Sequence, residues 1–163
     1  MNPYREIFRT MNEAGIRYLI VGGLAVNLHG YRRFTAGVGI FFALGKKNFG
    51  ENNRNIRSNG YGGRVPGGMK ELSDEKKIRQ LLEEKGMTAY TFLSDKRERI
   101  DIDVIAPDSL LFERYDRTRV VVDIDEAIQV PVISVDDLIH MKQKANRAKD
   151  IEDAAALLEL KGL

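Results

Sequence analysis

The sequence contains no cysteine and no tryptophan, and it has only two histidines and four prolines among 163 residues. Without cysteine, disulfide bonds and thiolate metal sites are excluded, and a reducing compartment is compatible. No apolar run approaches the roughly 20 residues that a membrane-spanning helix needs. The first residues carry charges where a signal peptide would have an apolar core. We therefore expect a cytoplasmic protein with no membrane partner.

Charge of neither sign dominates the chain. Lysine and arginine number 26 against 24 aspartates and glutamates, and a net charge of +2 is too small to indicate nucleic-acid binding by itself. With 43% hydrophobic and 31% charged residues, the composition is typical of a globular protein. The length suits one domain spanning residues 1–163, with a core in about 1–133 and a C-terminal helical pair in 134–163.

The stretch YLIVGGLAVNLHG, from residue 18 onward, organises the rest of the chain. Residues 18–21 predict a buried strand, Gly22 and Gly23 predict a tight turn, and residues 24–28 predict a short helix. Free N–H groups at a helix start favour an anion such as phosphate, and glycine lets it approach the backbone closely. Gly22 and Gly23 are therefore candidate phosphate-binding residues.

A second strand is predicted at residues 38–42, and glycines occupy positions 37 and 39. In extended backbone Gly37, Gly39 and Phe41 share one face. Glycine inside a strand costs roughly 0.5–1 kcal/mol relative to alanine, so two on one face indicate an open pocket or close backbone approach. A bulge or bend is the alternative. Two arginines, Arg32 and Arg33, lie just upstream. Their positive charge favours the interpretation that the glycine face forms the floor of a phosphate-binding pocket.

The remaining segments predict a mixed α/β fold. Before the central stretch, residues 3–14 predict a helix that ends at Gly15. The region 43–69 is rich in glycine and asparagine, and we expect only a weak helix at 46–58 and a loop at 61–69, either a flap over the ligand or a solvated loop. Beyond it we expect a helix at 73–86, a hairpin of strands at 88–93 and 99–105, a helix at 109–115 and a strand at 120–124. A further strand is expected at 128–133, and Pro131 predicts that it lies at an edge of the sheet. The last two helices are expected at 135–148, capped by Ser134, and at 151–160, capped by Asp150.

Two aspartates alternate with aliphatic residues in the second strand of the predicted hairpin. Asp101 and Asp103 therefore share one face of that strand, and the isoleucines and valine share the other. A solvated strand face is the ordinary explanation of such a pattern. A face that holds a metal ion is the functional alternative.

The order Gly-Gly, short helix, His-Gly-Tyr-Arg-Arg-Phe-Thr and apolar strand resembles the nucleotidyltransferases of the polymerase-beta superfamily, closest to the minimal nucleotidyltransferase and abortive-infection toxin-like bacterial families. In those families the strand after the threonine carries Asp-x-Asp, whose carboxylates hold Mg²⁺ on the nucleoside triphosphate. In this chain Gly37 and Gly39 stand at those two positions, after Thr35. The family's third carboxylate matches Asp101, and Asp103 is an adjacent second candidate.

The resemblance implies a nucleotidyltransferase fold, with a mixed sheet flanked by helices. It implies transfer of a nucleoside monophosphate from a triphosphate to a hydroxyl acceptor, an RNA, a protein or a small molecule, with Mg²⁺ as cofactor. Because both Asp-x-Asp carboxylates are absent, we expect this activity to be impaired. The alternative is a non-catalytic module that binds a nucleotide or a partner protein. The candidate site residues are Asp101 and Asp103 for metal and catalysis, Gly37 and Gly39 as vacated carboxylate positions, and Gly22, Gly23, Arg33, Thr35 and Lys149 for the nucleotide.

The C-terminal stretch KQKANRAKDIED, at residues 142–153, also resembles the family, whose last helices carry lysine, arginine and a Lys-Asp pair. Its cations could form a basic rim for RNA or for an acidic, antitoxin-like partner, although a solvated helix face is the commoner meaning of such a charge run. Residues of this basic rim are Arg32, Arg33, Lys142, Lys144, Arg147 and Lys149. The two histidines, His29 and His140, match no metal-binding spacing.

Overall fold

The computed structural model describes residues 4–35, 37–43, 54, 61–63, 89–94, 101–105, 109–125 and 127–162, and of these it describes 61–63, 89–94, 104–105 and 109–110 by their backbone alone. The predicted helix at 73–86 lies outside these ranges, as does all of the predicted helix at 46–58 except Arg54. The strands are β1 (Tyr18–Val21), β2 (Gly37–Phe42), β3 (Tyr61–Gly63), β4 (Ala89–Ser94), β5 (Asp101–Ile105), β6 (Val120–Asp125) and β7 (Ile128–Val132). The helices are α1 (Arg5–Glu13), α2 (Gly22–Leu28), α5 (Ser109–Arg117), α6 (Val135–Ala145) and α7 (Ala148–Leu160).

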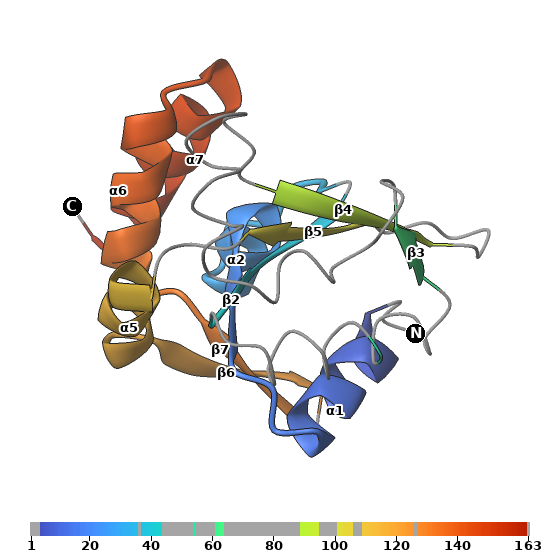
Figure 1. Cartoon of the computed structure of the whole chain (residues 1–163). Coiled ribbons are helices and arrows are strands. Elements are labelled where there is room, and N and C mark those ends of the chain that lie inside the picture. The colour runs from blue at the N-terminus through green and yellow to red at the C-terminus, as the bar shows by residue number, and fades with distance from the viewer. Residues whose placement is uncertain are drawn as a thin grey trace.

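The described strands form one seven-stranded mixed sheet in the order β3-β4-β5-β2-β1-β7-β6 (Figure 1). The pair β1–β2 is antiparallel, whereas β2–β5 and β1–β7 are parallel. The predicted hairpin of β4 and β5 is confirmed as an antiparallel pair. Helices pack against this sheet, so the predicted fold class, a mixed sheet flanked by helices, is confirmed.

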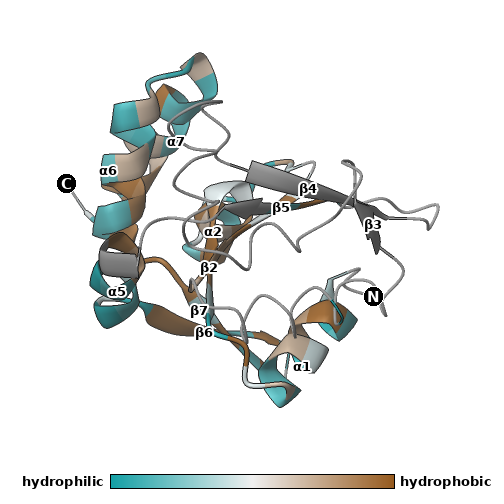
Figure 2. Ribbon diagram, in the orientation of Figure 1, coloured by the Kyte–Doolittle hydropathy of each residue, from teal (hydrophilic) through white to brown (hydrophobic). Residues whose placement is uncertain are grey.

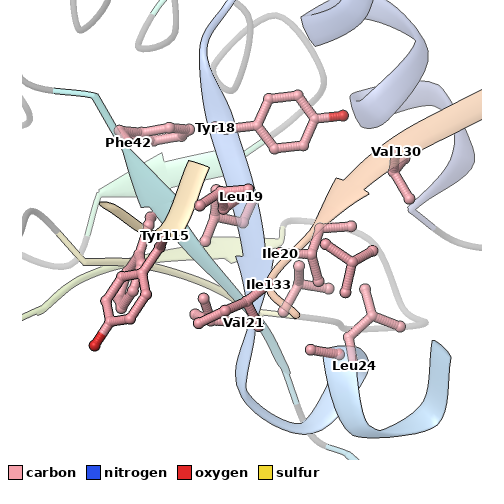
Figure 3. Close-up of a cluster of buried hydrophobic side chains, with 14 of the residues drawn as sticks. Tyr18, Leu19, Ile20, Val21, Leu24, Phe42, Tyr115, Val130 and Ile133 are labelled. Atoms are coloured by element: carbon pink, nitrogen blue, oxygen red, sulfur yellow. The ribbon is translucent and has the colours of Figure 1, made fainter. Parts of the chain in front are cut away.

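The core is centred on β1, because all four of its side chains are buried. Side chains alternate across a strand, so Leu19 and Val21 point toward the side of Tyr115 while Ile20 points toward Val130 (Figure 3). On the neighbouring strand β2, the side chains opposite the two glycines are also buried, as the alternation predicted. Hydrophobic residues concentrate in the central strands, and hydrophilic residues line the outer faces of α6 and α7 (Figure 2).

Helix α1 covers the sheet through an apolar stripe of Ile7, Phe8 and Met11, each at most 2% exposed. Its polar side is tied to β7, because Asn12 Nδ2 donates to the carbonyl oxygen of Gln129 over 2.7 Å. Gly15 ends the helix with a φ of +69°, a conformation that glycine adopts without strain. Among the described residues, no helix is long and apolar enough to cross a membrane.

Helices α6 and α7 lie side by side at one end of the sheet (Figure 1). Ser134 caps α6 as predicted, since its hydroxyl oxygen accepts from the backbone N–H of Asp137 over 3.2 Å. The helix ends at Ala145, three residues before the predicted end, because Asn146 adopts a left-handed φ of 52°. Helix α7 then begins at Ala148, so Asp150 is inside its first turn and is not the N-cap residue that we expected.

Two further predictions are wrong, the edge position of one strand and the extent of one loop. Strand β7 was expected at an edge because of Pro131, but it lies between β1 and β6. Position 131 tolerates proline because β7 and β1 are paired at only one position, Ile20↔Val132. The backbone N–H that proline lacks therefore removes little of the hydrogen bonding between these two strands. The predicted loop at 61–69 also begins with a strand, since Tyr61–Gly63 pairs with β4.

Candidate nucleotide-binding site

The floor of the candidate site is formed by the parallel strands β2 and β5. Their register places Gly37 beside Asp101 and Gly39 beside Asp103. Because paired residues in neighbouring strands point to the same side of a sheet, all four positions share one face. The structure thus brings together the two predicted metal-binding aspartates and the two vacated carboxylate positions.

A pocket of about 530 Å³ opens over this face. From the sheet and α2 it is lined by Val21, Gly22, Gly23, Arg33, Thr35, Gly37, Gly39 and Asp103. From α6 and α7 it is lined by Leu138, Met141, Lys142, Ala145, Arg147, Lys149 and Asp150. All of the predicted site residues except Asp101 therefore line one pocket, although they come from segments more than a hundred residues apart.

The two glycines at the front of the pocket begin α2 and do not form the separate turn that we predicted. Gly22 has a φ of +68°, which other residues adopt only with strain. Gly23 is needed for a different reason, because a β-carbon there would lie 2.6 Å from Thr35 Oγ1 and 3.0 Å from Thr35 Cβ. Thr35 is fixed in turn, since its hydroxyl donates to the carbonyl oxygen of Gly37 over 2.9 Å.

This packing predicts that Gly23→Ala destabilises the protein without any ligand. Forcing a methyl group into an occupied position typically costs about 1–3 kcal/mol. Chemical denaturation monitored by circular dichroism would measure the loss. Thr35→Ala removes the hydroxyl oxygen that lies nearest, so the same glycine substitution should cost less in that background. An equal cost in both backgrounds would show that Thr35 is not the obstacle.

A buried ionic cluster is made of Arg33, Lys142, Arg147, Asp150 and Asp153, and all of these residues except Asp153 line the pocket. Arg33 Nε lies 2.7 Å from Asp153 Oδ1, and its Nη2 donates to Asp153 Oδ2 over 2.9 Å. Lys142 Nζ lies 3.0 Å from Asp153 Oδ2 and 3.3 Å from Asp150 Oδ1. Arg147 Nε donates to Asp150 Oδ2 over 2.7 Å. The cluster therefore ties the segment before β2 to both C-terminal helices.

Members of the buried ionic cluster differ in their exposure to solvent. The side chains of Asp150 and Asp153 are only 2% and 1% exposed, whereas that of Arg147 is 78% exposed. Burial raises the pKa of Asp150, but hydrogen bonds from Arg147 and Lys142 and the charge of Lys142 outweigh it and hold that pKa below its usual value. A depressed carboxyl pKa contributes stability at neutral pH, and that contribution is lost as the pH falls through the folded-state pKa.

Sequence reasoning missed Asp153, the most deeply buried acid of the cluster. The available signal was its spacing from Asp150, because residues three apart on a helix lie on the same face. The basic rim is also smaller than predicted, since Arg33 and Lys142 are engaged in the cluster and Lys142 is only 8% exposed. Of the predicted rim, Arg32, Lys144, Arg147 and Lys149 are exposed.

The aspartates on the floor do not fit the metal site that the family resemblance implies. That site needs carboxylates at positions 37 and 39, and both are glycine. Within the described residues, no group of three or more histidine, cysteine, aspartate or glutamate side chains could hold a metal ion. Asp103 lines the pocket, but Asp101 does not, and the buried Oδ1 of Asp101 has no hydrogen-bond donor among the described residues. We therefore derive no chemistry from a bound metal.

His29 has a structural contact and does not line the pocket. Its Nε2 donates to the carbonyl oxygen of Ile133 over 2.7 Å, which links the end of α2 to the segment after β7.

Comparison with known proteins identifies the fold. No family model matches the chain, and neither does any curated protein sequence. The lincosamide antibiotic adenylyltransferase LnuA, solved with lincomycin bound, matches with a TM-score of 0.62 and 12% identity over 97% of this chain and 96% of its own. A Thermotoga maritima protein provisionally described as a nucleotidyltransferase matches with a TM-score of 0.58 and 14% identity over 95% of this chain and 89% of its own.

A third solved structure, ANT(2'')-Ia in complex with adenylyl-2''-tobramycin, matches with a TM-score of 0.57 and 13% identity over 94% of this chain and 84% of its own. All three alignments span nearly the whole chain, so the likeness extends from the sheet to the C-terminal helices. Together with the Gly-Gly helix start and the paired strands β2 and β5, these matches show that this chain has the nucleotidyltransferase fold.

Proposed function

We propose that this protein binds a nucleoside triphosphate in the pocket between β2, β5 and the C-terminal helices, and that it transfers nucleotide slowly or not at all. One observation carries the proposal: the register that sets Gly37 beside Asp101 and Gly39 beside Asp103 on the pocket floor. The pocket and the cations on its wall favour an anionic ligand. The two glycines remove the carboxylates on which the family's chemistry depends.

In nucleotidyl transfer, an acceptor hydroxyl attacks the α-phosphorus and pyrophosphate leaves. Little covalent chemistry falls to the protein, so catalysis depends on positioning and on neutralising the charge of the phosphates. On its pocket floor this chain offers Asp103 as an acceptor for the hydroxyl proton, but no carboxylate at either glycine position. Nucleotide binding needs only the cations and the cavity, so the loss of the two carboxylates should impair binding less than it impairs nucleotidyl transfer.

The proposal names the nucleotide but not an acceptor. LnuA and ANT(2'')-Ia were solved with antibiotic-derived ligands, yet at 12% and 13% identity they share only the fold with this chain. An RNA or antitoxin-like partner is less favoured, because Arg33 and Lys142 of the predicted basic rim are taken up by ion pairs with Asp153.

Titration and label transfer together test this function. Isothermal titration with each of the four common nucleoside triphosphates, in buffers with and without Mg²⁺, should detect binding of at least one of them. Incubation with ATP labelled at the α-phosphate should then leave less than one label per protein molecule on protein, RNA or aminoglycoside acceptors. Many turnovers of transfer in this assay would refute the impaired activity, and the absence of any binding would refute a nucleotide pocket.

A further inference from the structure

We propose that the pocket binds the nucleoside triphosphate as the metal-free anion, so that Mg²⁺ does not strengthen binding. This inference rests on the proposed function, and it goes beyond it by specifying the charge state of the ligand. It follows from the distribution of charge around the pocket, taken from the floor to the opposite wall.

The floor carries too few acidic groups to require a divalent ion. With aspartates at positions 37 and 39, four carboxylates would share one face of β2 and β5, and a triphosphate could enter only with cations that offset their repulsion. Among the residues that the structure describes, Asp101 and Asp103 are the only acidic residues on that face, and of these two only Asp103 lines the pocket. The electrostatic reason for bringing a metal with the nucleotide is therefore largely removed.

The opposite wall carries an excess of positive charge. Within the buried ionic cluster, the three cations Arg33, Lys142 and Arg147 share the two carboxylates of Asp150 and Asp153. Lys149 adds a further cation, since it lines the pocket, is exposed, and forms no ion pair with any residue that the structure describes. Together, the buried ionic cluster and Lys149 therefore carry two more cations than carboxylates.

Protein cations can offset part of the negative charge of a triphosphate that is bound between these two surfaces. Lys149 and the exposed guanidinium of Arg147 can bind phosphate oxygens directly, because neither side chain is buried. Arg33 and Lys142 contribute through their charge, as their donors are largely taken up by Asp153 and Asp150. A divalent ion on the triphosphate would lower its negative charge and weaken its attraction to this wall without gaining carboxylate ligands on the floor.

The experiment is isothermal titration of the protein with ATP, first in excess EDTA and then in saturating Mg²⁺, with ionic strength matched by NaCl. We expect ATP to bind in EDTA, and Mg²⁺ to leave the affinity unchanged or to weaken it by up to about fivefold, the scale of one exposed charge interaction. Binding that is at least tenfold tighter with Mg²⁺ would overturn the inference and leave the proposed function standing. Absence of binding in both buffers by ATP and by each of the other three common nucleoside triphosphates would overturn the proposed function itself.

Matched variants locate the effect in the pocket. Lys149→Ala should weaken ATP binding in EDTA by about three- to tenfold, since it removes one unpaired cation. Arg117→Ala removes an exposed cation at the end of α5, outside the pocket, and should leave the affinity unchanged. Equal losses in the two variants would indicate a nonspecific attraction and contradict a site on this wall.

Discussion

Asp153→Asn is expected to lower the melting temperature by about 10 °C, because breaking a buried ion pair from one side costs about 3–5 kcal/mol and each kcal/mol shifts a domain of this size by about 2–4 °C. The carboxylate is only 1% exposed and contacts both Arg33 and Lys142. After the substitution Arg33, whose side chain is 15% exposed, loses its charged partner. Lys142 keeps Asp150 at 3.3 Å. Differential scanning calorimetry would measure the shift.

Glu152→Gln is the matched control, because it makes the same acid-to-amide change at the adjacent, exposed position of α7. It should change the melting temperature by less than about 2 °C. A double-mutant cycle with Arg33→Gln separates the pair itself from general damage, since the second substitution should cost much less once Asp153 is already neutral. Additive losses in the cycle would mean that the two side chains are not energetically coupled.

The positions of the pocket floor could be predicted from the sequence because they follow from local patterns. The apolar run at residues 18–21 predicted β1, and the alternation around Gly37 and Asp101 predicted which residues share a face within β2 and within β5. Each of these patterns lies within a few residues. The nucleotidyltransferase fold was implied by the resemblance of this order of elements to a known superfamily.

Other features could not be predicted because they depend on contacts between distant segments. The ion pair between Arg33 and Asp153 joins residues 120 positions apart, and the spacing of Asp153 from Asp150 predicts a shared helix face but not its partner. The interior place of β7 likewise depends on its pairing with β1, which outweighs the local preference of Pro131 for an edge. The need for glycine at position 23 arises from Thr35, on a different segment.

The double substitution Gly37→Asp and Gly39→Asp should create a divalent-metal site on the floor of the pocket. Without metal the variant should be less stable than the native protein, for two reasons. A β-carbon at position 37 would lie 2.8 Å from the carbonyl oxygen of Asp101, so β5 must shift, whereas one at position 39 meets Val21 at 3.3 Å and needs a smaller adjustment. Four carboxylates on one face also repel one another and raise at least one carboxyl pKa.

Addition of Mg²⁺ and ATP should then reverse much of the loss in the double variant. A ligand that binds only the folded state at about 100 times its dissociation constant adds about 2.7 kcal/mol, which corresponds to a rise of about 5–10 °C in melting temperature. Label transfer from ATP should appear only in this variant. The control is the double substitution Gly37→Asn and Gly39→Asn, which has nearly the same shape and the same close contacts but no added charge. It should be destabilised by the packing and should gain no more from Mg²⁺ than the native protein does. If the aspartate and asparagine variants respond equally to Mg²⁺, the added carboxylates do not bind metal, and this face of β2 and β5 is not the place where the fold's chemistry could be restored.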